Sequence, residues 1–411
     1  MKNKTNVRKK IISAAVCTAA AALSCTAFAN GGFITLNDSA DSAAVFANGT
    51  ALTFTDSPFV KSGEVYVPVR EFLNSTSKAS ALTWNDDRTL SVIHEYNSDV
   101  TKKDIKTEIF FAIDNDSYKI KDYEKDTVRT CKLKNPPLLV DSKTYIPYEM
   151  IRVMDENMRI TNGIEIVVGD AAEGKEILEK SLAWANSLKT RDGKPRYEMM
   201  TESMQKEFIE LQKGYVGSEE WNYVIGYSSP WTLSSDILIS GANAYITYYQ
   251  SDSTPETYVY NETVTFEKSG DKLLVSGSEE FIPEDDRVCA YIRKIDGNKI
   301  TLDTVEFINC TDYERISELN LSEDSDFPNG FYIYNPDEST AEYELSEDTL
   351  YTFIDWNRAF SDEDADMFVS TNSLDIFTKY IESYENAKPG MPFLFELDGD
   401  NVMSVTERYI P

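Results

Sequence analysis

Residues 58–72 read PFVKSGEVYVPVREF, and residues 137–151 read PLLVDSKTYIPYEMI, which is the same pattern 79 positions later without a gap. Each copy reads as an apolar strand, a polar turn, a second strand that ends in Tyr-Val-Pro or Tyr-Ile-Pro, and the start of a helix. Proline suits this position because it ends a strand and its fixed φ fits the first turn of a helix. We therefore predict an internal repeat of two hairpin–helix units.

Two further hairpin signals flank the first copy, one at residues 45–52 with Asn-Gly at its turn and one at residues 82–93. Together with the repeat, they resemble the copper amine oxidase N-terminal-like (stalk) domain, and we assign residues 30–170 to it. This resemblance implies an exported protein of Gram-positive bacteria. In the second copy, Glu149 stands where the first copy has Arg70, so that copy diverges. The copper of the namesake enzymes belongs to a separate domain with three histidine ligands. This chain has a single histidine, His94, and cannot build that site.

The first 29 residues have the pattern of a cleaved secretory signal. Five basic residues precede an uncharged, largely apolar run from Ile11 to about Leu23, and Ala27-Phe28-Ala29 then offers a small-x-small cleavage site. The run is shorter than the roughly 20 residues that span a bilayer. We predict cleavage after Ala29 and an uncleaved N-terminal anchor as the alternative. We find no later apolar run of spanning length.

The charge balance excludes two classes of partner. The chain carries 40 basic and 70 acidic residues, a net charge of −30, and loss of the five basic residues of the signal would make it −35. Binding to nucleic acid or to an anionic lipid surface needs a basic footprint, which this composition does not supply. We therefore expect neither partner.

Residues 171–280 switch to helical periodicity and then to alternating strands. Ile177, Ser181, Trp184 and Leu188 share one stripe, and a second periodic stretch follows from Tyr197 to Leu211 with a break near Thr201. Strands are expected at 234–240, 244–250, 257–267 and 272–276. Helices before an antiparallel meander indicate an α+β cone. This order resembles a nuclear-transport-factor-like (SnoaL-like) domain.

The aromatic residues of this segment suggest a ligand pocket, because a curled sheet around helices can leave an apolar cavity. Our candidate ligand-binding residues are Trp184, Tyr197 and Trp231. The competing interpretation is that these side chains are ordinary core. We could not single out a poised acid or base beside them.

Residues 281–411 are predicted to form a third α+β unit of no recognised family. Asp296-Gly297 and Asp398-Gly399 mark two hairpins, and a helix is expected from Leu374 to about Tyr384. The run Asp362–Asp366 resembles the first half of a calcium loop, but Met367 stands where such a loop needs glycine, so we predict no calcium site there. Three cysteines follow the signal, and we expect free thiols: Cys131, Cys289 and Cys310.

Known catalytic patterns are missing from the sequence. Gly226-Tyr227-Ser228-Ser229-Pro230 lacks the last glycine of a nucleophile elbow and no histidine follows it. No cluster of Cys and His, phosphate loop or dinucleotide fingerprint occurs. We therefore predict an α+β, multi-domain protein without catalytic residues, metal or cofactor, secreted and associated with the cell surface. It would act as a binding or assembly module for a cell-wall component or another envelope protein. The alternative is a small-molecule sensor or an enzyme that uses the aromatic pocket.

Overall fold

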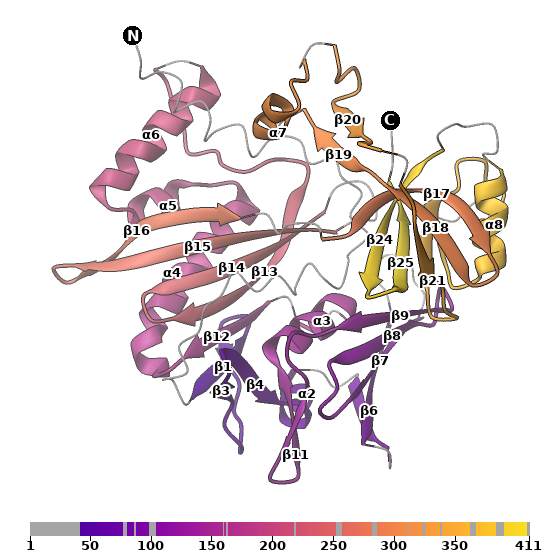
Figure 1. Ribbon diagram of the computed structural model, residues 1–411. Helices are drawn as coiled ribbons and strands as arrows, with labels where there is room; N and C mark the ends of the chain where they lie inside the picture. The colour runs from indigo at the N-terminus through magenta and orange to yellow at the C-terminus, as the bar shows by residue number, and fades with distance from the viewer. Residues whose placement is uncertain are drawn as a thin grey trace. The chain divides into compact units, whose positions relative to one another are not determined.

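The computed structural model describes residues 42–408 apart from short gaps (Figure 1). The residues not described are 1–41, 77–79, 86–87, 98–103, 159, 162, 218, 252–256, 282–285, 311, 323–324, 338, 362–366, 384–389 and 409–411. The chain divides into two compact units, which are described separately. Unit 2 holds the described residues up to Glu124 and Cys131–Asp285, and unit 1 holds Lys125–Thr130 and Asp286–Pro411. Several antiparallel sheets and a few helices make up the described residues, consistent with the predicted α+β class.

In unit 2, the two copies of the repeat form one four-stranded sheet in the order β10-β11-β4-β3. Its strands are β3 (Phe59–Lys61), β4 (Glu64–Pro68), β10 (Leu138–Val140) and β11 (Lys143–Pro147). The inner strands pair antiparallel with Val67 opposite Ile146, which are equivalent positions of the repeat. A local twofold axis therefore passes through this pair. Each copy continues into a helix, α2 (Val69–Thr76) or α3 (Tyr148–Met158).

A meander lies between the two copies of the repeat. Its strands in unit 2 are β5 (Ser80–Trp84), β6 (Thr89–Asn97), β7 (Asp104–Ala112) and β8 (Ser117–Asp122). Each strand pairs antiparallel with the next, and one face contributes Leu90, Val92, Ile109 and Phe111 to the core that also contains the repeat. The next strand, β9 (Thr127–Lys132), contains the division between the two units.

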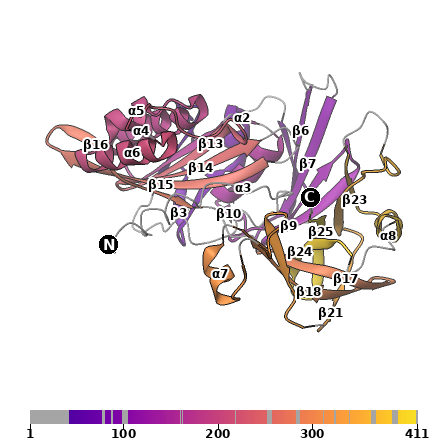
Figure 2. The ribbon, with the colours of Figure 1, turned by 90° about the horizontal axis from the view of Figure 1, so that it is seen from above.

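A seven-stranded sheet is the main element of unit 2, with the order β16-β15-β14-β13-β12-β1-β2. Its strands are β1 (Ala43–Ala47), β2 (Thr50–Ala51), β12 (Ile164–Val168), β13 (Trp231–Ser240), β14 (Asn243–Ser251), β15 (Thr257–Ser269) and β16 (Lys272–Phe281). β12 and β13 pair in parallel, and the chain between them carries three helices. These are α4 (Ala171–Thr190), α5 (Lys194–Met199) and α6 (Glu202–Val216). Figure 2 shows the three helices together on one face of β13–β16.

The large sheet separates two hydrophobic cores because side chains alternate between its faces. Ile166 and Leu238 pack into the core that contains α2 and α3, whereas Val167 and Ile237 pack into the core that contains α4 and α6. The sheet thus runs across the predicted boundary between residues 170 and 171. The predicted boundary between residues 280 and 281 lies close to the division at Asp285.

Unit 1 is built on a second seven-stranded sheet, in the order β21-β18-β17-β24-β25-β22-β23. Its strands are β17 (Val288–Asp296), β18 (Lys299–Thr304), β21 (Ala341–Glu344), β22 (Leu350–Ile354), β23 (Phe368–Thr371), β24 (Pro392–Asp398) and β25 (Asn401–Glu407). Aromatic residues from α8 (Leu374–Glu382) and the sheet fill its core, including the stacked pair Phe353 and Tyr380. A small hairpin of β19 (Glu306–Asn309) and β20 (Phe331–Tyr334) packs with α7 (Tyr313–Glu318).

Most predicted elements of residues 171–411 are present, and one expectation needs correction. The helices break at Thr201 as expected. Both Asp-Gly hairpins form, with Asp296 paired to Lys299 and Asp398 to Asn401. Cys289 and Cys310 are free thiols, whereas Cys131 is disulfide-bonded, so the expectation of a free thiol there is wrong. The run Asp362–Asp366 lies outside the described residues.

Candidate functional site

The three aromatic candidates occupy different environments. Trp184 lies on α4 and is 1% exposed, so it offers almost no surface to a ligand. Tyr197, on α5, is half-buried and belongs to the same core. Trp231, the first residue of β13, is 40% exposed and is not part of that core. The structure thus brings Trp184 and Tyr197 into one core without Trp231, and a ligand-binding role for the three remains a prediction.

Tyr197 belongs to a cluster of four aromatic rings in which Phe208 and Tyr223 are stacked and the other pairs lie edge to face or tilted. Its ring centroid is 5.7 Å from that of Phe208, 5.8 Å from Trp221 and 5.5 Å from Tyr223. Such offset and edge-on contacts each contribute about 0.5–1.5 kcal/mol beyond the burial of area. Through these contacts, the loop that carries Trp221 and Tyr223 packs against α5 and α6.

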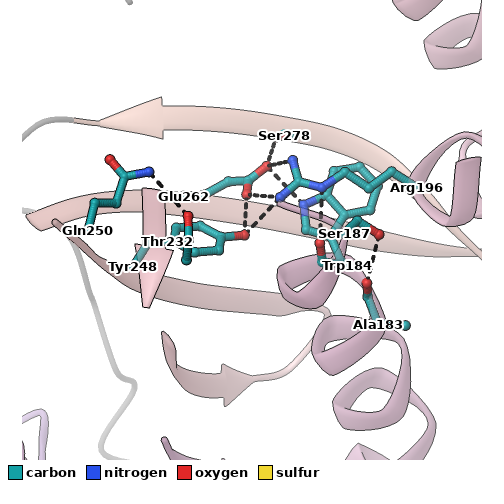
Figure 3. Close-up of polar contacts among 9 residues, drawn as sticks. All are labelled: Ala183, Trp184, Ser187, Arg196, Thr232, Tyr248, Gln250, Glu262 and Ser278. Atoms are coloured by element: carbon teal, nitrogen blue, oxygen red, sulfur yellow. Dashed lines mark hydrogen bonds and ion pairs between the residues drawn. The ribbon is translucent and has the colours of Figure 1, made fainter. Parts of the chain in front are cut away.

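A buried polar network surrounds Trp184, as Figure 3 shows. Glu262 of β15 is fully buried and forms an ion pair with Arg196 of α5, with N–O distances of 3.1 and 3.2 Å. The indole N–H of Trp184 donates to Glu262 Oε1 at 2.9 Å, and the hydroxyl of Tyr248 donates to Oε2 at 2.7 Å. Ser278 donates to Oε1 at 2.6 Å. We call these five residues the Arg196 network.

The guanidinium of Arg196 is equally well paired. Its Nε donates to the backbone carbonyl of Trp184 at 3.0 Å, one terminal nitrogen also donates to the hydroxyl of Tyr248, and its carbon lies 4.6 Å from the centroid of the indole ring. Burial alone would raise the pKa of Glu262, but Arg196 and the three neutral donors hold it below the ordinary value. Five accepted hydrogen bonds stabilise the ionised form of this buried carboxylate. It has neither the raised pKa nor the free lone pair of a catalytic acid or base.

Sequence reasoning missed Arg196 and Glu262. A signal for Glu262 was present, because it occupies an inward position of the alternating series Tyr260, Glu262, Val264 and Phe266. A charged residue at such a position needs a buried partner. No comparable pattern marked Arg196, since its short helix carries Pro195 in its first turn and has no regular apolar stripe.

The residues that the structure describes show no metal centre. No group of three or more His, Cys, Asp or Glu side chains is arranged to hold a metal ion within the described part of the chain. His94 is buried, at 5% exposure, and its Nδ1 lies 2.9 Å from the hydroxyl of Ser80. Burial lowers the pKa of His94. We also find, among the described helices, none that is long and apolar enough to cross a bilayer.

Comparison with protein families identifies the first part of the chain. Residues 46–165 match the copper amine oxidase N-terminal domain. This domain is non-catalytic, and the match runs from β1 to β12, which confirms the resemblance seen in the repeat. It covers less than a third of the 411 residues. The nuclear-transport-factor-like resemblance of residues 171–280 stays a prediction.

Comparisons with individual proteins add little. No curated protein matches the chain. A solved structure, that of Bdellovibrio bacteriovorus Bd1075, aligns with 51% of this chain and 94% of its own chain, at 10% sequence identity and a TM-score of 0.20. A TM-score this low supports no statement about a shared fold.

Proposed function

We propose that this protein is an exported, non-catalytic component of the bacterial envelope that acts as a binding or assembly module at the cell surface. The observation that carries the proposal is the match of residues 46–165 to a non-catalytic domain. The leader-like pattern of residues 1–29 supports export, and the high negative charge favours partners that are neither nucleic acid nor anionic lipid.

The Arg196 network supports a non-catalytic role for residues 171–280. Its only carboxylic acid, Glu262, already accepts hydrogen bonds from five donors, and the Trp184 ring is buried. Catalysis would need a group free to exchange a proton with a substrate. We therefore favour a role in which the rigid core presents its outer surface to a partner.

A binding experiment with purified cell walls tests this proposal. The chain from residue 30 onward is mixed with peptidoglycan sacculi, with and without wall polymers, and sedimented over a range of protein concentrations. Saturable co-sedimentation that excess soluble wall fragments abolish would support the proposal. Failure to bind either the walls or any extracted envelope protein would overturn it, as would turnover of a small substrate by the same preparation. Trp231→Ala then asks whether the exposed candidate contributes to binding.

A further inference from the structure

Helix α3 faces an excess of buried or partly buried acid. Four carboxylates lie on this helix or against it, together with its single arginine, Arg152: Glu64 of β4, Glu149 and Asp155 of α3, and Asp236 of β13. We call these five residues the α3 cluster. It lies where the second copy of the repeat packs on the large sheet, because Met150, Ile151 and Met154 of α3 share a core with Ile166 and Leu238 of that sheet.

Arg152 is bound most directly to the large sheet. Its Nε lies 3.6 Å from Asp236 Oδ2 and donates to the hydroxyl of Tyr249 at 3.3 Å. That hydroxyl in turn donates to Asp236 Oδ2 at 2.7 Å, and the backbone N–H of Ile164 donates to Oδ1 at 2.9 Å. These contacts join α3 to β12, β13 and β14.

The other three carboxylates accept backbone N–H groups instead of a cation. Glu64 Oε1 accepts from Tyr148 at 3.1 Å, and Asp155 Oδ1 accepts from Thr161 at 2.5 Å. Glu149 Oε2 accepts from Lys134 at 2.9 Å, but its Oε1 is buried without a hydrogen-bond partner, although the residue is only 7% exposed. A buried, unpartnered carboxylate oxygen is costly when ionised and is relieved when it takes up a proton.

The charges that face the cluster do not balance. Arg152 is its one buried cation, and the charge of Lys134 acts on Glu64 and Glu149. Glu165 of β12 is a further acid that acts on Asp155, and burial raises its own pKa to about 7. Tyr148 and Tyr249 are neutral neighbours. Burial raises the pKa of Glu64, Glu149 and Asp155 to about 7 each, and it also raises the pKa of Asp236.

We propose that protons control the docking of α3 on the large sheet, so that this junction is tight in mild acid and loosens as the pH rises to neutrality. The sign follows from proton linkage. The folded cluster binds protons that the unfolded chain has already lost between about pH 4.5 and 7, so the stability of the junction falls as the pH rises through that window. Ionised acids left in the junction then repel one another around a single arginine.

Hydrogen exchange on the chain from residue 30 onward tests whether protons control the docking of α3. Protection of the α3 amides is measured at pH 5.5 and pH 8.0 and corrected for the intrinsic change in exchange rate. We expect protection of α3 to fall at least tenfold at pH 8.0, since one shifted acid alone changes an equilibrium tenfold per pKa unit. Helix α6, which packs on the opposite face, is the internal control and should change much less.

Variants separate titration from a merely structural role. Glu64→Gln with Glu149→Gln keeps both acceptors but removes the charges, so the fall in α3 protection between the two pH values should shrink. Glu173→Gln, at an exposed position of α4, should leave the fall unchanged. A fall that persists in the double variant, that is absent from the parent chain, or that α6 shares equally would overturn the proposal.

Direct titration keeps the proposal testable if the double variant does not fold. The unmodified chain is titrated folded and in urea, and the difference counts the protons held by the fold. We expect the folded chain to retain at least about two extra protons at pH 6. Equal proton counts in the two states would contradict the proposal.

Discussion

Replacing Glu262 with glutamine should be among the most damaging single changes in unit 2. The substitution keeps the size of the side chain but removes the charge that Arg196 faces at 3.1 and 3.2 Å. The two carboxylate oxygens now accept from Trp184 and Tyr248, and the substitution replaces one of them with an amide N–H₂ that cannot accept. Breaking a buried ion pair by altering one partner costs about 3–5 kcal/mol, because the other charge is left buried and uncompensated. We expect a loss in that range.

Urea unfolding followed by tryptophan fluorescence measures the loss, since four of the five tryptophans, at 84, 184, 221 and 231, belong to unit 2. Glu267→Gln is the matched control, because this glutamate lies on the same strand and is exposed. Its free energy of unfolding should stay within about 0.5 kcal/mol of the parent. The loss from Glu262→Gln should also be smaller at low pH, because protonation removes the charge in the parent as well. The lowered pKa of Glu262 means that its stabilisation is present above its unfolded pKa and disappears as the pH falls through the folded value.

A double-mutant cycle with Arg196→Met tests the assignment of the energy to the pair. Removing both charges together should cost less than the sum of the two single losses, by about 2 kcal/mol or more. In the double variant neither charge remains buried without its partner. A loss below about 1 kcal/mol for Glu262→Gln, or additive single losses, would refute the reasoning that this ion pair organises the core.

Two glycine substitutions and one ion comparison give further tests. Gly174→Ala in α4 should lower the melting temperature, because the added methyl group would collide with Val167 of the sheet, whereas Gly214→Ala in α6 has open space and should stabilise by about 0.5–1 kcal/mol. Thermal unfolding of both variants tests this prediction. A change in melting temperature of the same sign in the two variants would refute it. Calcium and magnesium should stabilise the protein equally at matched ionic strength, by relieving its self-repulsion. A gain with calcium alone that Asp362→Asn with Asp364→Asn abolishes would instead show a specific site.

The sequence by itself determined the local elements. The spacing of 79 residues between two similar patterns predicted two hairpin–helix units, and both formed because proline position, turn residues and apolar alternation act within each copy. The same local rules placed α4, the break at Thr201 and the hairpins at Asp296 and Asp398. The sequence also led us to assign residues 30–170 to a stalk domain, and the family match at residues 46–165 lies within that assignment.

Only the tertiary structure decided which elements share a sheet. β12 pairs in parallel with β13, although more than 60 residues separate Val168 from Trp231, so one sheet serves both the first domain and the segment after it. No local pattern encodes such a pairing, because it depends on where the helices between the two strands pack. The same holds for Arg196 and Glu262, and for Arg152 and Asp236. Each charge is tolerable in the interior only because the fold brings its partner from a distant part of the sequence.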